Sequence, residues 1–217
     1  MNKNISEINM IKQQLRTGDV IDERILNLYH TLHREDFVPT DYRPVAYSDI
    51  QIPLRHQQSM LTPLEEALIL QTLQLKGHET VLEIGTGTGF LTALLSKVAK
   101  HVVSVDYFEE FTERAKKSCH IHGCTNIEFI TGDGCQGWVA KAPYDVIVIT
   151  GAMKALTETL KLQVLLGGQL FAIIGKHPVM EGNIYRVDHN GQWTQDLVFE
   201  TNTPLLIDKQ SHQQFVF

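Results

Sequence analysis

The chain has 217 residues, 43% of them hydrophobic, and a formal net charge of −6. This length fits one α/β domain with an elaboration or two small domains, and the acidic balance argues against a protein that coats nucleic acid. No apolar run reaches the length of a membrane span, and the polar start does not resemble a signal peptide. Three closely spaced cysteines do not suggest a disulfide framework: Cys119, Cys124 and Cys135. We therefore expect a cytoplasmic monomer or small homo-oligomer, with no nucleic-acid partner and no membrane segment.

The first 62 residues predict a helical segment followed by an extended one. Apolar side chains recur at helical spacing around Asp22, which can cap a helix: Ile21, Ile25, Leu28, Tyr29 and Leu32. Prolines 39, 44 and 53 then interrupt regular structure, which predicts an extended segment over residues 37–61.

Thr62, Pro63 and Glu65 predict the start of a long helix. Thr62 can cap it, proline suits the first helical position, and Glu65 completes a capping box. We expect this helix to end near Gly77, where glycine can take the left-handed conformation. The start of this helix divides the chain into two parts. The N-terminal segment, residues 1–62, is expected to pack on a core of residues 63–217.

From residue 80 onward, short apolar segments alternate with helical ones, a pattern typical of a buried parallel sheet. The expected strands are Thr80–Ile84, His101–Val105, Ile127–Ile130, Asp145–Thr150 and Gln169–Ile174. Two more, Ile184–Asp188 and Trp193–Phe199, flank Asn190-Gly191, a strong signal for a hairpin turn. The pattern predicts an α/β fold with a mostly parallel, doubly wound sheet that ends in an antiparallel hairpin.

Three alternate glycines, Gly85, Gly87 and Gly89, separate the first strand from a predicted helix over Phe90–Ala99. Glycine permits positive φ and close approach of a ligand, and the helix N-terminus offers unpaired N–H groups. Asp106 follows about twenty residues later at the tip of the next strand, where a carboxylate can hold ribose hydroxyls. This arrangement predicts a site for an adenosine cofactor.

The glycine spacing separates two classes of cofactor. The dinucleotide fingerprint reads G-x-G-x-x-G, whereas here the glycines read G-x-G-x-G and Phe90 occupies the place of the third dinucleotide glycine. Glu83 lies two residues before the first glycine. The order E-x-G-x-G-x-G resembles the first motif of class I S-adenosylmethionine-dependent methyltransferases. That resemblance implies a Rossmann-like methyltransferase fold and S-adenosylmethionine as the cofactor.

Further blocks resemble the protein-L-isoaspartate O-methyltransferases. They include Arg34-Glu35-x-Phe37-Val38-Pro39, Gly132-Asp133-Gly134 and Ala142-Pro143-Tyr144-Asp145, in order and spread over most of the chain. Members of this family methylate the α-carboxyl group that is freed when Asp or Asn isomerises, as a step in protein repair. The resemblance therefore implies a protein or peptide carboxylate as the methyl acceptor.

The resemblance also implies a set of cofactor-binding residues: Glu83, Gly85, Thr86, Gly87, Gly89, Asp106, Tyr107, Asp133 and Gly134. Asp106 is expected at the ribose, and Asp133 and Gly134 beside the adenine. Two alternatives stay open. The sequence Gly-Asp-Gly is typical of a turn, so Asp133 could be a turn residue, and Tyr107 could be an ordinary surface residue. Since a carboxylate acceptor is already ionised at neutral pH, we nominate no catalytic acid or base.

The acceptor loop departs from the family pattern, which reads roughly G-Q-T-I-S-x-P. Gln58 and Ser59 are the matching candidates, whereas Leu61 replaces the serine that the family places at the reaction centre. We expect Ser59 to be a residue of the approach to the helix or a threonine replacement, rather than a source of the missing hydroxyl. Leu206 also replaces a threonine near the cofactor. Three possibilities therefore stay open: methylation of an isoaspartyl carboxylate, methylation of another acceptor, and cofactor binding without turnover.

Two further places in the sequence could carry a functional role: a cysteine–histidine stretch and a loop histidine. Cys119, His120, His122 and Cys124 share one short stretch, but zinc sites usually join two separated pairs of ligands, so we expect no metal. His56 lies in the altered loop, where a solvated side chain is the alternative to a functional one.

Overall fold

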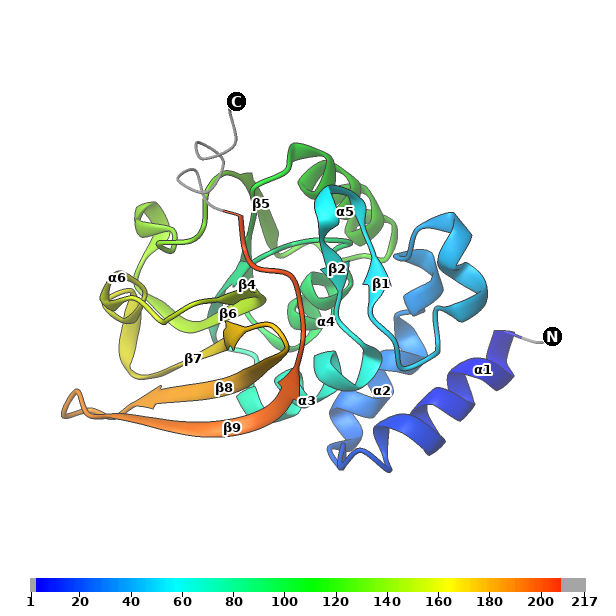
Figure 1. Ribbon diagram of the computed structural model, residues 1–217, viewed down its shortest axis with the longest axis horizontal. Coiled ribbons are helices and arrows are strands. Elements are labelled where there is room, and N and C mark those ends of the chain that lie inside the picture. Colours follow the sequence, from blue (N-terminus) through cyan, green and yellow to red (C-terminus); the bar gives the residue numbers. More distant parts are fainter. Residues whose placement is uncertain (1–2, 208–217) are drawn as a thin grey trace.

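The computed structural model describes residues 3–207, so residues 1–2 and 208–217 of the expected N-terminal segment and core lie outside the described residues. Its centre is a seven-stranded sheet in the order β5-β4-β3-β6-β7-β8-β9 (Figure 1). The strands are β3 Thr80–Ile84, β4 His101–Asp106, β5 Ile127–Thr131, β6 Tyr144–Met153, β7 Val164–Lys176, β8 Val179–Val187 and β9 Trp193–Thr201. Neighbours from β5 through β7 are parallel, whereas β8 and β9 are antiparallel. The predicted fold class is confirmed.

The hairpin between β8 and β9 turns where the sequence predicts it. Asp188 N–H donates to the carbonyl of Gln192 at 3.0 Å, and Gly191 takes a φ of 81°. The strands extend beyond their predicted ends, since β7 begins at Val164 and β8 at Val179. Residues 176–179 join those two strands in a second turn, which the sequence analysis did not predict.

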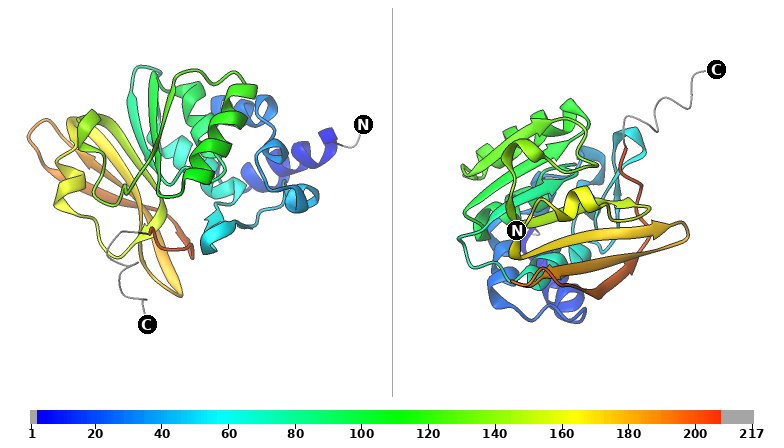
Figure 2. Two further views of the ribbon diagram at one scale, coloured as in Figure 1. Left: turned by 90° about the horizontal axis from the view of Figure 1, so that it is seen from above. Right: turned by 90° about the vertical axis from the view of Figure 1, so that its left-hand side faces the viewer.

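Alternate side chains of the central strands enter two hydrophobic clusters, one on each face of the sheet. Val146 and Val148 belong to one cluster, and Ile147 and Ile149 to the other, as the period of two in a strand requires. The first face carries α3 Pro63–Leu73, α4 Phe90–Val98 and α5 Glu109–Ile121, and the second face carries the short α6 Glu158–Lys161. Figure 2 shows the larger helices together on one side of the strands.

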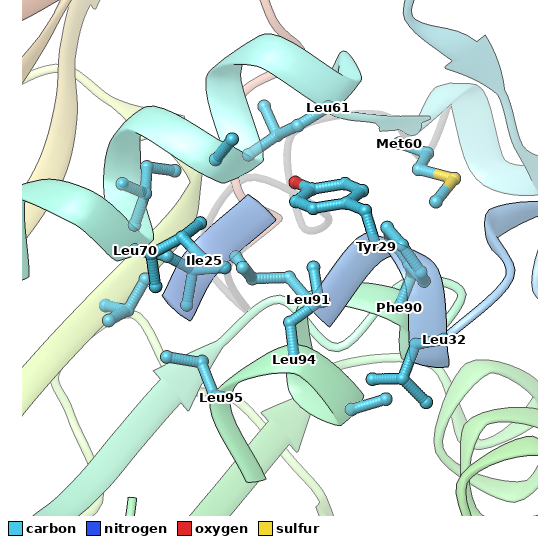
Figure 3. Close-up of a cluster of buried hydrophobic side chains, with 14 of the residues drawn as sticks. Ile25, Tyr29, Leu32, Met60, Leu61, Leu70, Phe90, Leu91, Leu94 and Leu95 are labelled. Atoms are coloured by element: carbon cyan, nitrogen blue, oxygen red, sulfur yellow. The ribbon is translucent and has the colours of Figure 1, made fainter. Parts of the chain in front are cut away.

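The N-terminal segment packs on the first face. It contains α1 Lys3–Met10, a π-helical turn at Ile11–Leu15, and α2 Glu23–Thr31. Asp22 caps α2 by accepting a hydrogen bond from the N–H of Arg24 at 2.8 Å, as predicted. Tyr29 and Leu32 of this segment are buried in the same cluster as Phe90 and Leu94 of α4 (Figure 3).

Residues 37–61 are less extended than predicted. They hold 3-10 helical turns at Thr40–Val45 and Arg55–Gln57, after a similar turn at Arg34–Asp36, and a small antiparallel pair of β1 Ile52–Pro53 with β2 Ser59–Met60. Pro44 lies inside the first of these turns. Proline excludes long α-helix and sheet pairing, but its fixed φ is compatible with a short turn.

The capping box predicted for α3 is confirmed, but the predicted end of this helix is wrong. Thr62 N–H donates to Glu65 Oε2 at 2.7 Å, and Glu65 N–H donates back to Thr62 Oγ1 at 3.2 Å. The helix ends at Leu73, and Gln74 takes the left-handed conformation with a φ of 48°. Gly77 instead belongs to a loop whose N–H groups converge on Glu79, with Gly77 N–H at 2.9 Å from Oε2. A short 3-10 turn at Val139–Lys141 completes the described elements.

Candidate active site

A cavity opens at the carboxyl ends of β3, β4 and β6, where parallel α/β sheets bind ligands; it holds about 580 Å³ of empty space, part of it open to solvent. It is lined by Ile84 and Asp106, the last residues of β3 and β4, and by Thr150 of β6. The cavity therefore lies where the glycine loop and the acid at the tip of β4 predict a cofactor site.

The glycine loop has the conformation that its sequence predicts. Gly85 and Gly87 line the cavity with φ values of 100° and 53°, in the region that side chains disfavour. A Cβ at Gly85 would lie 2.2 Å from Thr150 Oγ1, which donates to the carbonyl of Gly85 at 2.7 Å. Glycine at this position thus permits both the turn and its attachment to β6.

Asp106 joins the cavity wall to the glycine loop. Its Oδ2 accepts a hydrogen bond from Gly87 N–H, and its Oδ1 accepts one from Phe108 N–H, both at 2.9 Å. Burial raises the pKa of this carboxyl, and the backbone N–H groups oppose that shift by stabilising the charged form. A carboxylate in this position suits the hydroxyl groups of a ribose.

Glu83 is completely buried beneath the loop. Its Oε2 accepts hydrogen bonds from Ser104 Oγ at 2.6 Å and from Thr92 Oγ1 at 2.5 Å, which join β3 to β4 and α4. Burial raises the pKa of Glu83 to about 7, against the lowering effect of the two hydroxyls. Thr86 also turns inward and hydrogen-bonds Ser104 at 2.7 Å. In the described structure, Glu83 holds the base of the loop and is not part of the cavity wall.

Gly89 and the Gly-Asp-Gly turn have distinct places in the structure. A Cβ at Gly89 would lie 2.6 Å from the Cβ of Ala115, so this glycine allows α4 and α5 to approach closely. Gly134 lines the cavity against Ile84, whereas Asp133 accepts from Cys135 N–H at 3.0 Å within its own turn. Among the described residues, neither Gly89 nor Asp133 lines the cavity, but Tyr107 does.

The loop before α3 closes one side of the cavity. Gln58 and Ser59 line it, as the match to the family loop predicts. His56 stacks on Phe108 with ring centroids 3.8 Å apart, and its Nε2 lies 2.7 Å from a carboxylate oxygen of Glu110. The His56 side chain is 42% exposed, so it is a solvated loop side chain that also contacts Phe108 and Glu110.

Leu61 points into the protein core. Its side chain is 4% exposed and belongs to the cluster of Tyr29, Phe90 and Leu91 (Figure 3). Its carbonyl accepts a hydrogen bond from the buried Arg34 at 2.5 Å. The apolar residue in place of the family's serine therefore contributes to packing between the loop, α2 and α4.

Several wall residues were not predicted from the sequence. Thr150 could have been found, because it ends a predicted strand at the binding edge of the sheet. Phe108 and Cys135 follow predicted residues but have no signal of their own. Thr203 comes from the segment after β9, and its hydroxyl lies 3.4 Å from that of Ser59. No local pattern indicates that two residues so far apart in sequence meet here.

Residues 3–207 contain neither a metal-binding cluster nor a membrane-spanning helix. No group of three or more His, Cys, Asp or Glu side chains in this range could hold a metal ion. None of the helices there combines the length and apolar character that a membrane crossing requires.

Comparisons with known proteins agree with this geometry. A family model described as protein-L-isoaspartate(D-aspartate) O-methyltransferase matches residues 5–203. A protein-L-isoaspartate O-methyltransferase of Methanoculleus marisnigri is 38% identical over 166 residues, which cover 76% of each chain. A relative of the same name from Dictyoglomus turgidum is 35% identical over 185 residues, covering 82% of this chain and 84% of the relative.

Solved structures show the same fold. A protein-L-isoaspartate O-methyltransferase superposes with a TM-score of 0.79 at 24% identity, covering 97% of this chain and 70% of that one. A putative Plasmodium falciparum protein-L-isoaspartate O-methyltransferase in complex with S-adenosyl-L-homocysteine gives a TM-score of 0.76 at 16% identity, covering 92% and 97%. The chain belongs to the protein-L-isoaspartate O-methyltransferase family and is an S-adenosylmethionine-dependent methyltransferase.

Proposed function

We propose that this protein transfers the methyl group of S-adenosylmethionine to the carboxylate exposed by isoaspartyl residues in damaged proteins or peptides, in the cytoplasm. The observation that carries the proposal is the cavity at the carboxyl edge of the sheet. It joins the glycine loop and Asp106 to the acceptor loop at Gln58 and Ser59. Family membership supports the acceptor class.

The cavity suits the cofactor in shape and charge. Gly85 and Gly87 leave the wall free of side chains, and the Asp106 carboxylate would accept hydrogen bonds from ribose hydroxyls. Gly134 borders the same cavity next to Ile84, where a planar base can lie against an apolar surface. When bound, S-adenosylmethionine supplies an electrophilic methyl group. Glu83 acts indirectly, by holding the base of the loop through Ser104 and Thr92.

The reaction asks the protein for position rather than for proton transfer. A bond forms between a carboxylate oxygen and the methyl carbon while the carbon–sulfur bond breaks, which yields a methyl ester and S-adenosylhomocysteine. Because the acceptor is already ionised, no general base is required. The protein's contribution is to align the reacting atoms and to exclude water.

Contrary to the expectation from the sequence, this proposal gives Ser59, together with Thr203, the place of the missing serine. Their hydroxyls lie 3.4 Å apart in the cavity wall, and Ser59 also donates to Gln51 Oε1 at 3.1 Å. When each hydroxyl turns its one proton away from its present partner, the pair can donate hydrogen bonds to the two oxygens of an acceptor carboxylate. Because Leu61 is turned into the core, it leaves this part of the cavity to them.

A matched pair of peptides tests the proposal. The two peptides have one sequence and differ only in an aspartyl or an isoaspartyl linkage, and the cofactor carries a labelled methyl group. We expect base-labile label in the isoaspartyl peptide alone, and its loss in Asp106→Ala. A folded protein that binds the cofactor yet labels neither peptide would contradict isoaspartyl activity and favour the second candidate, another acceptor, which the replacement at Leu61 suggests.

A further inference from the structure

The hydroxyl of Ser59 belongs to a hydrogen-bond network that extends from the cavity wall into the protein. Ser59 donates to Oε1 of Gln51 at 3.1 Å, and Nε2 of Gln51 donates in turn to Thr201 Oγ1 at 3.2 Å. Thr201 donates to Oε1 of Glu65, whose Oε2 accepts from Thr62 N–H at 2.7 Å. Ser59 lines the cavity, whereas the other members of the network do not. The network therefore joins the cavity wall to the end of β9 and the first turn of α3.

The carboxylate of Glu65 sets the direction of the hydrogen bonds in this network. Because a carboxylate only accepts, the single proton of Thr201 points to Glu65, and the lone pairs of Thr201 remain for Gln51. The Gln51 amide must then present its NH2 group to Thr201 and its oxygen to Ser59. The reverse orientation would put the amide oxygen where Nε2 now lies, 3.5 Å from Glu65 Oε1, with no proton between the two oxygens.

This direction determines what Ser59 offers to a ligand. A hydroxyl has one proton and two lone pairs, and the Ser59 proton is already donated to Gln51. The lone pairs of Ser59 therefore face Thr203 and the cavity, where Ser59 serves as an acceptor. The Thr203 hydroxyl lies 3.4 Å from Ser59 Oγ and has a proton that it can turn to a ligand. The wall thus presents one acceptor and one donor side by side.

An isoaspartyl residue carries the complementary pair of groups. Isomerisation routes the peptide chain through the side-chain carbonyl, which leaves the free carboxylate and an amide N–H on the same carbon. In an ordinary aspartyl residue a methylene separates the carboxylate from that carbon. A donor and an acceptor 3.4 Å apart suit the isoaspartyl arrangement, in which the carboxylate and the N–H are neighbours. One hydroxyl does not serve both groups, because they lie closer together than the directions of its proton and lone pairs.

We propose that Gln51 is a positioning residue that keeps Ser59 a hydrogen-bond acceptor, so that Ser59 receives the amide N–H of the isoaspartyl residue while Thr203 donates to its carboxylate. Of the arrangements open to the two hydroxyls, the network favours this one, because donation by Ser59 to the carboxylate would break its bond to Gln51. The inference rests on the proposed isoaspartyl acceptor and adds how the site distinguishes that linkage from an aspartyl one.

An amide form and an ester form of one isoaspartyl peptide test this role without methyl transfer. In the ester form, an oxygen replaces the N–H of the isoaspartyl residue, and both peptides are titrated into protein saturated with S-adenosylhomocysteine. We expect the wild-type protein to bind the amide form roughly three- to tenfold more tightly, the range of one neutral hydrogen bond. In Ser59→Ala and in Gln51→Met this preference should fall below about twofold. The same ester replacement one residue further along the peptide controls for the change of linkage.

The variants separate the direction of the hydroxyl from its presence. Gln51→Met retains the Ser59 hydroxyl, and it should bind the ester peptide at least as tightly as the wild type does, which a disrupted site would not. Gln57→Met, at an exposed position of the same loop, should keep the full preference. If Gln51→Met does not fold, Gln51→Asn tests the same point, because its shorter amide does not reach both Thr201 and Ser59.

Two results would overturn the inference: equal affinity of the wild-type protein for the amide and ester peptides, or an undiminished preference in a folded Gln51 variant. Either result leaves the isoaspartyl acceptor intact, because the amide peptide still binds. A wild-type protein that binds neither peptide would overturn the proposed acceptor and this inference together. The measurement therefore distinguishes failure of the positioning role from failure of the proposed function.

Discussion

The carboxylate of Asp106 accepts a hydrogen bond from the backbone N–H of Gly87 at 2.9 Å. One side chain at the end of β4 thus fixes the loop that leaves β3, and it also lies in the cofactor cavity. Loop geometry and ribose binding therefore depend on the same residue.

Asp106→Asn should weaken the binding of S-adenosylhomocysteine roughly ten- to a hundredfold. Hydrogen bonds to a charged group contribute about 1.5–3 kcal/mol, and the amide cannot accept with both of its terminal atoms. Isothermal titration calorimetry measures the change. Asp41→Asn, at an exposed position, is the control and should bind normally. Unaltered affinity in Asp106→Asn would remove Asp106 from the site.

Gly89→Ala should destabilise the fold more than Gly191→Ala does. Both glycines have a φ near 80°, so both variants bear the cost of a left-handed alanine, about 1–2 kcal/mol. A Cβ at Gly89 also meets Ala115, whereas one at Gly191 meets no atom within 4 Å. We expect about 1–3 kcal/mol of additional destabilisation for Gly89→Ala from this clash. Urea unfolding measures both, and equal losses would show that close packing of α4 on α5 does not require this glycine.

Leu61→Ala should lower the free energy of unfolding by about 2–5 kcal/mol, because it leaves a cavity among α2, α3 and α4. Leu162→Ala provides the comparison, since that side chain is 83% exposed and its loss should change stability by less than about 0.5 kcal/mol. Thermal and urea unfolding test the difference. Leu61→Ser should be destabilised at least as much as Leu61→Ala. A fully stable Leu61→Ser would contradict the packing role.

Glu83→Gln should alter how stability depends on pH. The pKa of Glu83 rises from 4.5 to about 7 on folding, so between these values the folded protein binds a proton that the unfolded chain releases. The wild type therefore loses stability at this group as pH rises from about 4.5 to 7, by a total on the order of 3 kcal/mol. The variant, which stays neutral, should gain stability relative to the wild type between pH 5 and pH 8.

Unfolding at these two pH values measures the gain for Glu83→Gln. Burial also raises the pKa of Glu66, which is present in both proteins; the charge of Glu83 is the smallest of the named causes of that shift, so most of the Glu66 contribution cancels in the comparison. Glu113→Gln, at an exposed position of α5, should show no such gain. A constant difference between Glu83→Gln and the wild type across pH would mean that Glu83 is ionised throughout.

Local patterns in the sequence were enough to predict the architecture that carries the site. The strand Thr80–Ile84, the glycines that follow it and Asp106 at the next strand end are short-range features, and the structure places them as predicted. The capping box at Thr62 and Glu65 is equally local. The end of α3 was not predictable in this way, because Glu79 organises the loop around Gly77 and leaves Gln74 to end the helix.

Contacts between distant segments account for what the sequence does not reveal. Thr203 reaches the cavity beside Ser59 only because β9 returns the chain to that edge. The inward direction of Leu61 depends on Tyr29 and Phe90, which come from two other helices. Glu83 matches a cofactor motif, yet its hydrogen bonds to Ser104 and Thr92 turn it beneath the loop. In each case tertiary packing determines the role of a residue whose type is evident from the sequence.

A crystal structure of the protein with S-adenosylhomocysteine tests the central claim most directly. We expect the ribose hydroxyls within hydrogen-bond distance of the Asp106 carboxylate and the sulfur beside Ser59. A ribose bound away from Asp106, or a sulfur bound far from Ser59, would contradict the proposed cofactor site.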